Sequence, residues 1–178
     1  MVVPKPLKPG QIKPSLRPVI DFRPVNRNIA SDPVIVDRTH DLRMETRPNK
    51  FRSTFDFPSA YMQIGIKKSD RHRTAFTFDN QQYQFTVFPF GLKTSGSSFI
   101  RVMNMVMREL DPERCLNYVD DFLLIDNDFE SHLDNMRQFF KSVRKLGLKL
   151  AFDKCNLGQK EVKFLGIILN DNGFQVNP

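Results

Sequence analysis

The sequence predicts an α+β fold in the split β-α-β arrangement, and the order of its hydrophobic patterns from residue 51 onward predicts it. Two stretches carry the spacing of amphipathic helices, and short apolar runs with strand character precede and follow each of them. The resulting order is strand, inserted hairpin, helix, strand, strand, helix, strand. This is the order of a ferredoxin-like sheet with two helices.

The first 50 residues have few strong patterns. Five of the first 18 residues are proline, which excludes a helix there and favours an extended or looped chain. We expect a strand at Arg17–Phe22 and a short helix near His40–Glu45. The pattern sharpens at Phe51–Asp56, which we expect to form the first strand of the core.

Further strands are expected between this core strand and the first helix. Residues 61–66 alternate between apolar and other side chains, which is typical of a strand. Thr74–Phe78 and Gln82–Val87 flank Asp79-Asn80, a turn-prone pair, so we expect a hairpin there.

Both core helices are predicted from an apolar stripe and its end signals. The first follows three serines that can cap its N-terminus, and Pro112 marks its end. The second can begin at Asp128 and end at Gly147. The expected stripes are Phe99, Met103, Val106 and Leu110 in the first helix, and Leu133, Met136, Phe140, Val143 and Leu146 in the second.

The remaining strands are short. Cys115–Val119 and Phe122–Ile125 are apolar runs joined by Asp120-Asp121, which predicts a tight hairpin. Leu148–Phe152 is expected to be a further core strand. A last hairpin is expected from Val162–Leu169 and Phe174–Val176, which flank the turn sequence Asp171-Asn172-Gly173.

Charge and cysteine content limit the function classes. The 178-residue chain has a formal charge of +7, of which +5 falls in residues 1–56. A basic first third suits a polyanionic partner such as nucleic acid, although solvated surface charge would give the same count. Cys115 and Cys155 form no Cys-x-x-Cys pair, so the sequence has no zinc-ribbon or redox motif. No apolar run approaches the ~18–20 residues that span a bilayer, and we expect a soluble intracellular protein.

The predicted topology brings three distant aspartates to one edge of the sheet. In this arrangement the third strand lies between the first two, and the first two point the same way. The end of the first strand, at Asp56, therefore lies at the same edge as the turn that carries Asp120 and Asp121. Because neighbours on a strand point to opposite faces, we expect Asp121 to need the turn geometry to join the others.

Carboxylates that converge repel one another unless a cation lies between them. Mg²⁺ prefers carboxylate and phosphate oxygens, and two such ions roughly 3.5–4 Å apart can activate a hydroxyl and stabilise the leaving oxygen of a phosphoryl displacement. Nucleotidyl transfer is a reaction of this kind. Each aspartate also has an ordinary interpretation, since Asp-Asp pairs occur in solvated turns and Asp56 can cap a helix after Pro58.

Four other residues are candidates for nucleotide binding. The guanidinium of Arg17 matches phosphate oxygens, but Arg17 can equally be a surface residue before an edge strand. Tyr61 could pack under a sugar ring or belong to the core. Phe90 and Gly91 could form a loop close to a base, or only a Pro-Gly turn.

Five segments resemble, in order, the motifs of reverse transcriptases. Tyr118-Val119-Asp120-Asp121 resembles the Tyr-x-Asp-Asp signature, and Ser53–Ile64 resembles the motif of the first catalytic aspartate. The other three are Arg17–Asn26 for the fingers, Phe88–Leu92 with Ser98-Phe99 at the start of the palm helix, and Phe164–Gly166 near the primer-gripping hairpin. One such match is weak, whereas five in order over nearly the whole chain are specific. The closest similarity is to gypsy-like LTR retrotransposons and retroviruses.

The resemblance implies an RNA-directed DNA polymerase that uses two Mg²⁺ ions, with Mn²⁺ as an alternative. It implies that Asp56, Asp120 and Asp121 are catalytic metal ligands, of which the first two hold the ions most directly, and that the backbone carbonyl of Phe57 faces a metal. The other implied roles are Arg17 on the triphosphate, Tyr61 as the gate against a ribose 2′-hydroxyl, Phe90 and Gly91 in the nucleotide pocket, Tyr118 and Val119 as hairpin support, and Leu165 and Gly166 near the primer terminus.

The resemblance also implies a polymerase palm with partial fingers. We expect partial fingers at 1–50, the palm at 51–60 and 91–160, an insertion with a hairpin at 61–90, and a terminal hairpin at 161–178. The expected partners are an RNA or DNA template, a primer, deoxynucleoside triphosphates and the rest of a Pol polyprotein, in cytoplasmic virus-like particles or in the nucleus. We expect the chain to be a fragment of that polyprotein, without thumb, connection or ribonuclease H.

Two alternatives stay open. A catalytically incompetent remnant of the palm could bind nucleic acid without extending a primer. A metal-dependent nuclease or phosphatase could use the same carboxylates, but no His or Lys is placed near the Asp motifs to act as a general acid or base, which counts against it.

Overall fold

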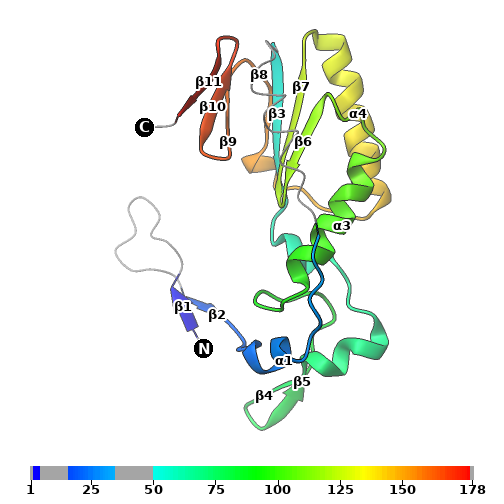
Figure 1. Cartoon of the computed structure of the whole chain (residues 1–178), viewed down its shortest axis with the longest axis vertical. Coiled ribbons are helices and arrows are strands. Elements are labelled where there is room, and N and C mark those ends of the chain that lie inside the picture. The colour runs from blue at the N-terminus through cyan, green and yellow to red at the C-terminus, as the bar shows by residue number, and fades with distance from the viewer. Residues whose placement is uncertain (1, 5–15, 35–49, 177–178) are drawn as a thin grey trace. The chain divides into compact units, whose positions relative to one another are not determined.

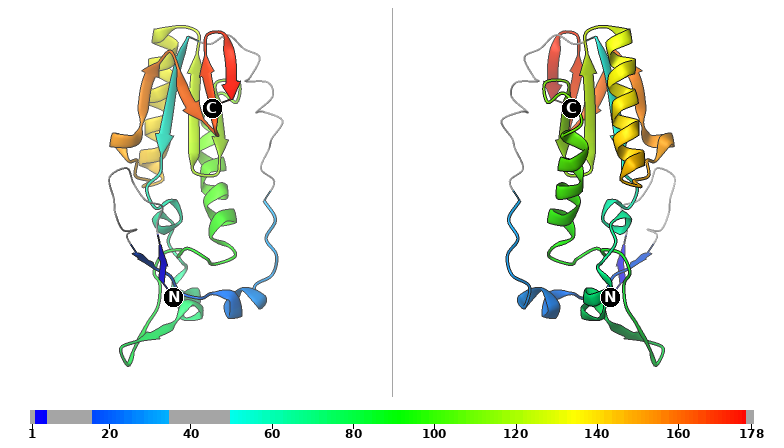
Figure 2. Two further views of the ribbon diagram at one scale, coloured as in Figure 1. Left: turned by 90° about the vertical axis from the view of Figure 1, so that its left-hand side faces the viewer. Right: turned by 90° about the vertical axis from the view of Figure 1, so that its right-hand side faces the viewer.

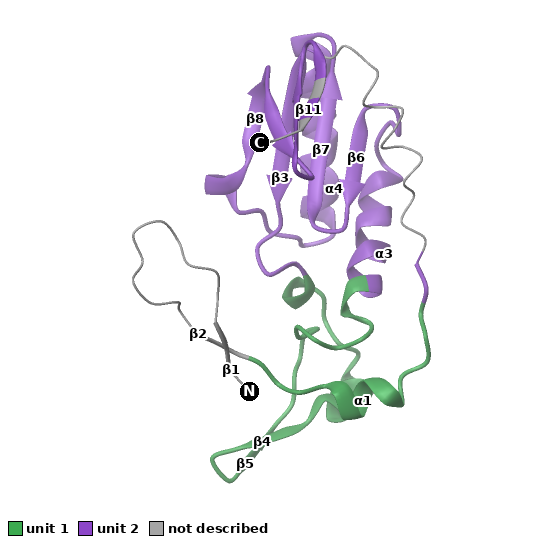
Figure 3. Cartoon of the chain, turned by 60° about the vertical axis from the view of Figure 1, so that its left-hand side comes forward, with its two compact units in different colours: residues 1–32, 61–96 green, residues 33–60, 97–178 purple. Residues whose placement is uncertain are grey.

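The computed structural model describes residues 2–4, 16–34 and 50–176, which fall into two units (Figures 1 and 3). One unit contains the described parts of residues 1–32 and 61–96, and the other contains those of 33–60 and 97–178. Among the described residues, no helix is both long enough and apolar enough to cross a membrane.

The second unit is built on a four-stranded antiparallel sheet. Its strands are β3 (Phe51–Asp56), β6 (Cys115–Tyr118), β7 (Asp121–Asp126) and β8 (Asn156–Gln159), in the order β6-β7-β3-β8. Since β3 and β6 are each antiparallel to β7, they point the same way. The predicted split β-α-β topology is therefore confirmed.

One face of this sheet packs against two helices, α3 (Ser95–Met107) and α4 (Phe129–Lys145). Figures 1 and 2 show α4 lying along the sheet. Phe55 and Phe122 are opposite each other in register, and their rings lie 4.2 and 4.6 Å from the ring of Phe139 on α4. All four residues of the predicted stripe from Phe99 to Leu110 are buried.

The buried face of α4 differs from the predicted one, because part of it is polar. Asp128 caps the helix and Gly147 follows its end with φ 69°, as expected. The predicted stripe was wrong in part: Val143 is buried, whereas Phe140 is 36% exposed. The residues of α4 that are buried are His132, Asn135, Phe139, Ser142 and Val143.

Hydrogen bonds explain why polar residues take these positions. His132 Nε2 lies 2.7 Å from the hydroxyl of Ser53, and its Nδ1 lies 2.7 Å from a carboxylate oxygen of Asp126. Asn135 donates to the same carboxylate. Because a buried polar group with partners avoids the cost of desolvation, apolar periodicity alone could not locate this face.

The other face of the sheet packs against a separate three-stranded sheet. Its strands are β9 (Val162–Phe164), β10 (Ile167–Asn170) and β11 (Gly173–Val176), in the order β11-β10-β9. The predicted turn at Asp171-Asn172 is confirmed by the pairing of Asn170 with Gly173. A second turn, Leu165-Gly166, divides the predicted strand Val162–Leu169 into two.

The predicted core strand at Leu148–Phe152 was wrong. The chain forms a 3-10 helix, η3, at Phe152–Lys154, and the fourth strand of the core is β8. The side chains of β3 explain this choice, because the Ser53 hydroxyl accepts from the backbone N–H of Gly158 and the Thr54 hydroxyl accepts from the amide of Asn156.

The first unit consists of short elements. The predicted strand at Arg17–Phe22 is limited to Leu16–Pro18, and a helix follows it. The hairpin around Asp79-Asn80 is confirmed, with shorter strands. The elements are β1 (Val2–Pro4), β2 (Leu16–Pro18), α1 (Arg23–Arg27), η1 (Ala60–Gln63), η2 (Lys68–Thr74), β4 (Phe76–Phe78) and β5 (Gln81–Tyr83).

The predicted strand at residues 61–66 was wrong. Its start belongs to the 3-10 helix η1, where the N–H of Ile64 bonds to the carbonyl of Tyr61. Only single contacts with the segment after β5 remain strand-like, such as the bridge between Gly65 and Val87. The helix predicted near His40–Glu45 lies outside the described residues.

Candidate active site

The three aspartates singled out by the sequence lie at one edge of the four-stranded sheet. Asp56 is the last residue of β3 and is directly opposite Asp121, the first residue of β7. Tyr118, the last residue of β6, is opposite Asp121 on its other side. Residues opposite each other in an antiparallel pair have Cα atoms about 4.5–5.5 Å apart and side chains on the same face. Asp56, Asp121 and Tyr118 therefore form a row across three strands.

The register corrects the expected role of the turn. We expected Asp121 to need turn geometry to join the other two aspartates, but Asp121 faces Asp56 through ordinary strand pairing. Asp120 is the residue that lies in the turn. The placement of Asp120 therefore depends on the turn conformation, and that of Asp121 depends on the sheet.

The turn between β6 and β7 is held in an unusual conformation. Val119 has a φ of 58°, which is strained for a β-branched residue. The side-chain amide of Asn117 donates to the carbonyls of Val119 and Asp121, at 3.1 and 3.2 Å. These bonds span the turn on both sides of Asp120 and compensate for the strain.

The local electrostatics are those of crowded negative charge. Burial raises the pKa of Asp121, and the neighbouring charges of Asp120 and Asp56 raise it further. The ammonium of Lys154 lies 3.4 Å from Asp56 Oδ1 and offsets part of this charge. The backbone carbonyl of Asp56 accepts from the N–H of Ala151, which fixes the end of β3 to the segment that leads to Lys154.

Lys154 is a residue that the sequence patterns missed. It is 98 positions from Asp56 and belongs to no motif that we singled out. The expectation that no Lys lies near the Asp motifs was therefore wrong, because the fold brings Lys154 to within 3.4 Å of Asp56.

The donor chemistry of this edge fits divalent cations. Carboxylate oxygens are the preferred ligands of Mg²⁺, and a cation between the carboxylates would relieve the repulsion that raises the pKa of Asp121. Within the described ranges, no three His, Cys, Asp or Glu side chains are already gathered into a complete metal site. Phe57 fits the expected arrangement only through its backbone, since its ring is buried against Phe99 and Phe139.

The candidate nucleotide-binding residues Tyr61, Phe90 and Gly91 belong to the first unit. The rings of Tyr61 and Phe90 meet edge to face, with centroids 5.6 Å apart. Gly91 has a φ of 86°, which other residues rarely adopt, and its carbonyl accepts from the side-chain amide of Asn26. Arg17 lies in β2, but its side chain is outside the described part of the structure.

Leu165 and Gly166, expected near the primer terminus, form the two-residue turn between β9 and β10. Both have positive φ, of 49° and 80°, which is the conformation of a tight hairpin turn. Leu165 is 41% exposed, although Phe164 before it is buried. The turn thus presents an apolar side chain to solvent at the tip of a hairpin.

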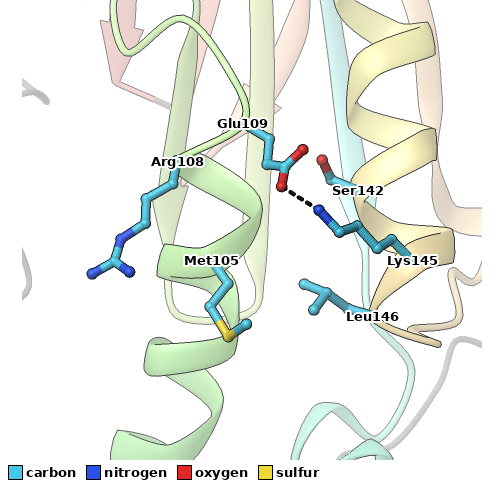
Figure 4. A pocket seen from close by; sticks show the side chains of 6 residues that line it. All are labelled: Met105, Arg108, Glu109, Ser142, Lys145 and Leu146. Atoms are coloured by element: carbon cyan, nitrogen blue, oxygen red, sulfur yellow. Dashed lines mark hydrogen bonds and ion pairs between the residues drawn. The ribbon is translucent and has the colours of Figure 1, made fainter.

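A pocket of about 210 Å³ lies elsewhere in the second unit, between α3 and α4 (Figure 4). An ion pair of 2.6 Å between Lys145 and Glu109 closes part of it. Because these helices pack on the sheet face opposite to that of Asp56 and Asp121, the pocket is not part of the carboxylate site. It is lined by Met105, Arg108, Glu109, Ser142, Lys145 and Leu146.

Comparisons with known proteins find matches that cover most of the chain. The model of the family "Reverse transcriptase (RNA-dependent DNA polymerase)" matches residues 3–169. The retrovirus-related Pol polyprotein from transposon 412 of Drosophila melanogaster is 33% identical over 173 residues, which is 97% of this chain and 14% of the polyprotein. The Pol polyprotein from transposon gypsy of the same organism is 28% identical over 93% of this chain and 16% of its own length.

The fold also matches solved structures. A foamy viral protease-reverse transcriptase, solved in complex with an RNA/DNA hybrid, matches with a TM-score of 0.82 and 24% identity. The match covers 98% of this chain and 23% of the viral chain. This chain therefore spans less than a quarter of the length of the relatives described here.

Proposed function

Because this chain belongs to the reverse transcriptase family, we propose that it contributes the catalytic palm of an RNA-directed DNA polymerase, as part of a retroelement Pol polyprotein. The observation that supports this best is the register that sets Asp56 opposite Asp121, with Asp120 in the adjoining turn. Family membership confirms the resemblance drawn from the five sequence motifs. The match of the chain's fold to a solved reverse transcriptase supports the assignment of the second unit to the palm.

The proposed site residues are the three aspartates. Reverse transcriptases as a family use divalent metal ions, and we propose that Asp56, Asp120, Asp121 and the backbone carbonyl of Phe57 hold two Mg²⁺ ions. Bound there, the ions would lower the pKa of the primer 3′-hydroxyl and balance the charge of the triphosphate. In this proposal, the strained turn at Val119, with Tyr118 before it, positions Asp120 for metal binding, and the φ of 58° at Val119 supports a fixed turn conformation.

The proposed substrates are a template, a primer and deoxynucleoside triphosphates. In this proposal, Arg17 binds the triphosphate, Phe90 and Gly91 shape the pocket, and Tyr61 excludes ribonucleotides by contact with the sugar. The contact of Tyr61 with Phe90 supports its role, because an edge-to-face pair restricts the movement of the ring.

The domain assignment is also part of the proposal. The unit with the four-stranded sheet corresponds to the palm, and the unit with residues 61–96 corresponds to parts of the fingers and the insertion. The hairpins from Val162 to Val176 would lie near the primer terminus through their turn at Leu165-Gly166.

Primer extension on an RNA template tests the function. The wild-type chain with Mg²⁺ should add deoxynucleotides to a labelled DNA primer, and Asp120→Asn and Asp56→Asn should each reduce extension to background. Asp134→Asn is the matched control, since Asp134 is exposed on α4 and pairs with nearby Arg137. Circular dichroism of each variant shows whether the fold is retained.

Each outcome separates the alternatives. Binding of an RNA/DNA duplex by the wild-type chain without any extension would support the non-catalytic remnant. Release of nucleotides or phosphate without synthesis would support a nuclease or phosphatase. Unfolding of Asp56→Asn would show that Asp56 has a structural role as a cap, which the sequence left open.

A further inference from the structure

Two sheets of the second unit meet face to face without sharing a ladder of backbone hydrogen bonds. Among the described residues, β9, β10 and β11 form a sheet of their own beside the four-stranded sheet. An apolar cluster joins the two sheets. It comprises Leu116, Leu123, Ile125, Val162 and Phe164, with Leu169 packed against it. Apolar contact is not directional, so this cluster holds the sheets together without fixing their angle.

Arg52 supplies the directional contact between the two sheets. It is the second residue of β3 and is only 2% exposed, which is rare for an arginine. Its guanidinium donates to the carbonyl of Lys160, to the carbonyl of Asn170 at 2.6 Å, and to the carboxylate of Asp171 at 3.1 Å. These three partners belong to the β9–β11 sheet, to its turn or to the link that enters it.

These three partners lie at one end of the hairpin formed by β9 and β10. Lys160 lies just before β9, and Asn170 is the last residue of β10, so one planar group binds both arms at the open end. A guanidinium has its donors in a fixed fork, which sets the orientation of the groups that it binds. The ion pair with Asp171 offsets only part of the cost of burying the charge of Arg52, because Asp171 is 54% exposed and solvent screens the pair.

The closed end of the same hairpin is the Leu165-Gly166 turn. Gly166 is four residues from Asn170, and Asp56 is four residues from Arg52, so each lies about 13 Å from the Arg52 contact along an extended strand. Figure 1 shows β9 and β10 beside β3, with their connecting turn toward the end at which β3 finishes. A tilt of roughly 10° at the open end would therefore move the turn by about 2 Å.

We propose that Arg52 is a positioning residue for DNA synthesis: its guanidinium, bonded to Lys160, Asn170 and Asp171, fixes the Leu165-Gly166 turn relative to Asp56 and so places the primer terminus. This inference rests on the proposed function. A shift of about 1 Å between a reacting group and its catalytic residues can cost on the order of 100-fold in rate, so the orientation of this hairpin has a measurable effect.

The test compares Arg52→Met with Arg52→Lys, Asp171→Ala and the control Arg137→Met, which removes an exposed guanidinium from α4. Arg52→Met should lower the kcat of primer extension and raise the KM for primer-template, each about tenfold, and leave the KM for deoxynucleotide unchanged. In hydrogen exchange, amides of residues 162–176 should exchange about tenfold faster, while those of α4 and β7 keep the wild-type rate. Arg52→Lys should restore part of both effects, and Asp171→Ala should show a smaller change of the same kind.

The failures are distinguishable. If the wild-type chain extends primers and Arg52→Met does so with the same kcat and the same KM for primer-template, the positioning role is overturned and the proposed function stays intact. If Arg52→Met unfolds the whole unit, Arg52→Lys and Asp171→Ala decide, and wild-type values of KM and exchange in both would overturn the role. Absence of extension by the wild-type chain would refute the proposed function, and the role in primer placement with it.

Discussion

Replacing Asp126 with Ala should destabilise the second unit strongly, because Asp126 is the centre of a buried polar network. It is 4% exposed, and its carboxylate bonds to the guanidinium of Arg114, to His132 and to the amide of Asn135. His132 continues the network to the hydroxyl of Ser53 on β3. The network therefore joins β3, β7 and α4.

The expected loss in the free energy of unfolding follows from the hydrogen-bond donors that lose their acceptor. A hydrogen bond to a charged group contributes about 1.5–3 kcal/mol, and removing one partner of a buried ion pair costs about 3–5 kcal/mol. Asp126→Ala leaves three donors without their acceptor. The side chain of Arg114 is 32% exposed and can be partly solvated, which places the expected loss near the lower end, about 3 kcal/mol.

Equilibrium unfolding in urea, followed by circular dichroism, measures this loss. Asp134→Ala is the matched control, since Asp134 lies on the same helix in an ion pair whose side chains are 65% and 66% exposed. An exposed pair of this kind contributes less than about 1 kcal/mol. A loss below about 1 kcal/mol for Asp126→Ala, or one equal to that of the control, would refute the reasoning.

Two further predictions concern the reactivity of the Cys115 thiol and the choice between ribonucleotides and deoxynucleotides. Burial raises the pKa of the Cys115 thiol to about 12, so at pH 8 iodoacetamide should label Cys155 and leave Cys115 unmodified until the protein unfolds. Peptide mass mapping measures the labelling of each cysteine, and equal labelling of both in the folded protein would contradict the prediction. In the same primer-extension assay, Tyr61→Ala should incorporate ribonucleotides, because the ring that contacts the sugar is removed. Unchanged discrimination between ribonucleotides and deoxynucleotides would argue against Tyr61 as the gate.

Several parts of the fold followed from local chemistry in the sequence. The hairpin turns at Asp79-Asn80 and Asp171-Asn172 were predicted, as was the cap at Asp128, because short polar side chains favour these conformations wherever they stand. The order of apolar runs then gave the topology, which led to the prediction that Asp56 and the Asp120-Asp121 turn share an edge.

The errors arose where partners distant in the sequence decided the outcome. Residues 61–66 alternate like a strand, yet they meet only isolated partners and begin as a 3-10 helix. The polar face of α4 was missed, because His132 is stable in the core only with Asp126 and Ser53 as partners. Periodicity treats every histidine as polar and cannot detect such partners.

The sequence by itself determined the two core helices, the hairpin turns and the edge at which the three aspartates lie, because turn chemistry and hydrophobic period act over a few residues. Only the tertiary structure decided that Asp121 faces Asp56 while Asp120 occupies the turn, that Lys154 lies 3.4 Å from Asp56, and that Arg52 binds the open end of the β9–β10 hairpin. Such contacts join positions 65 to 118 residues apart, and packing of the whole unit brings them together.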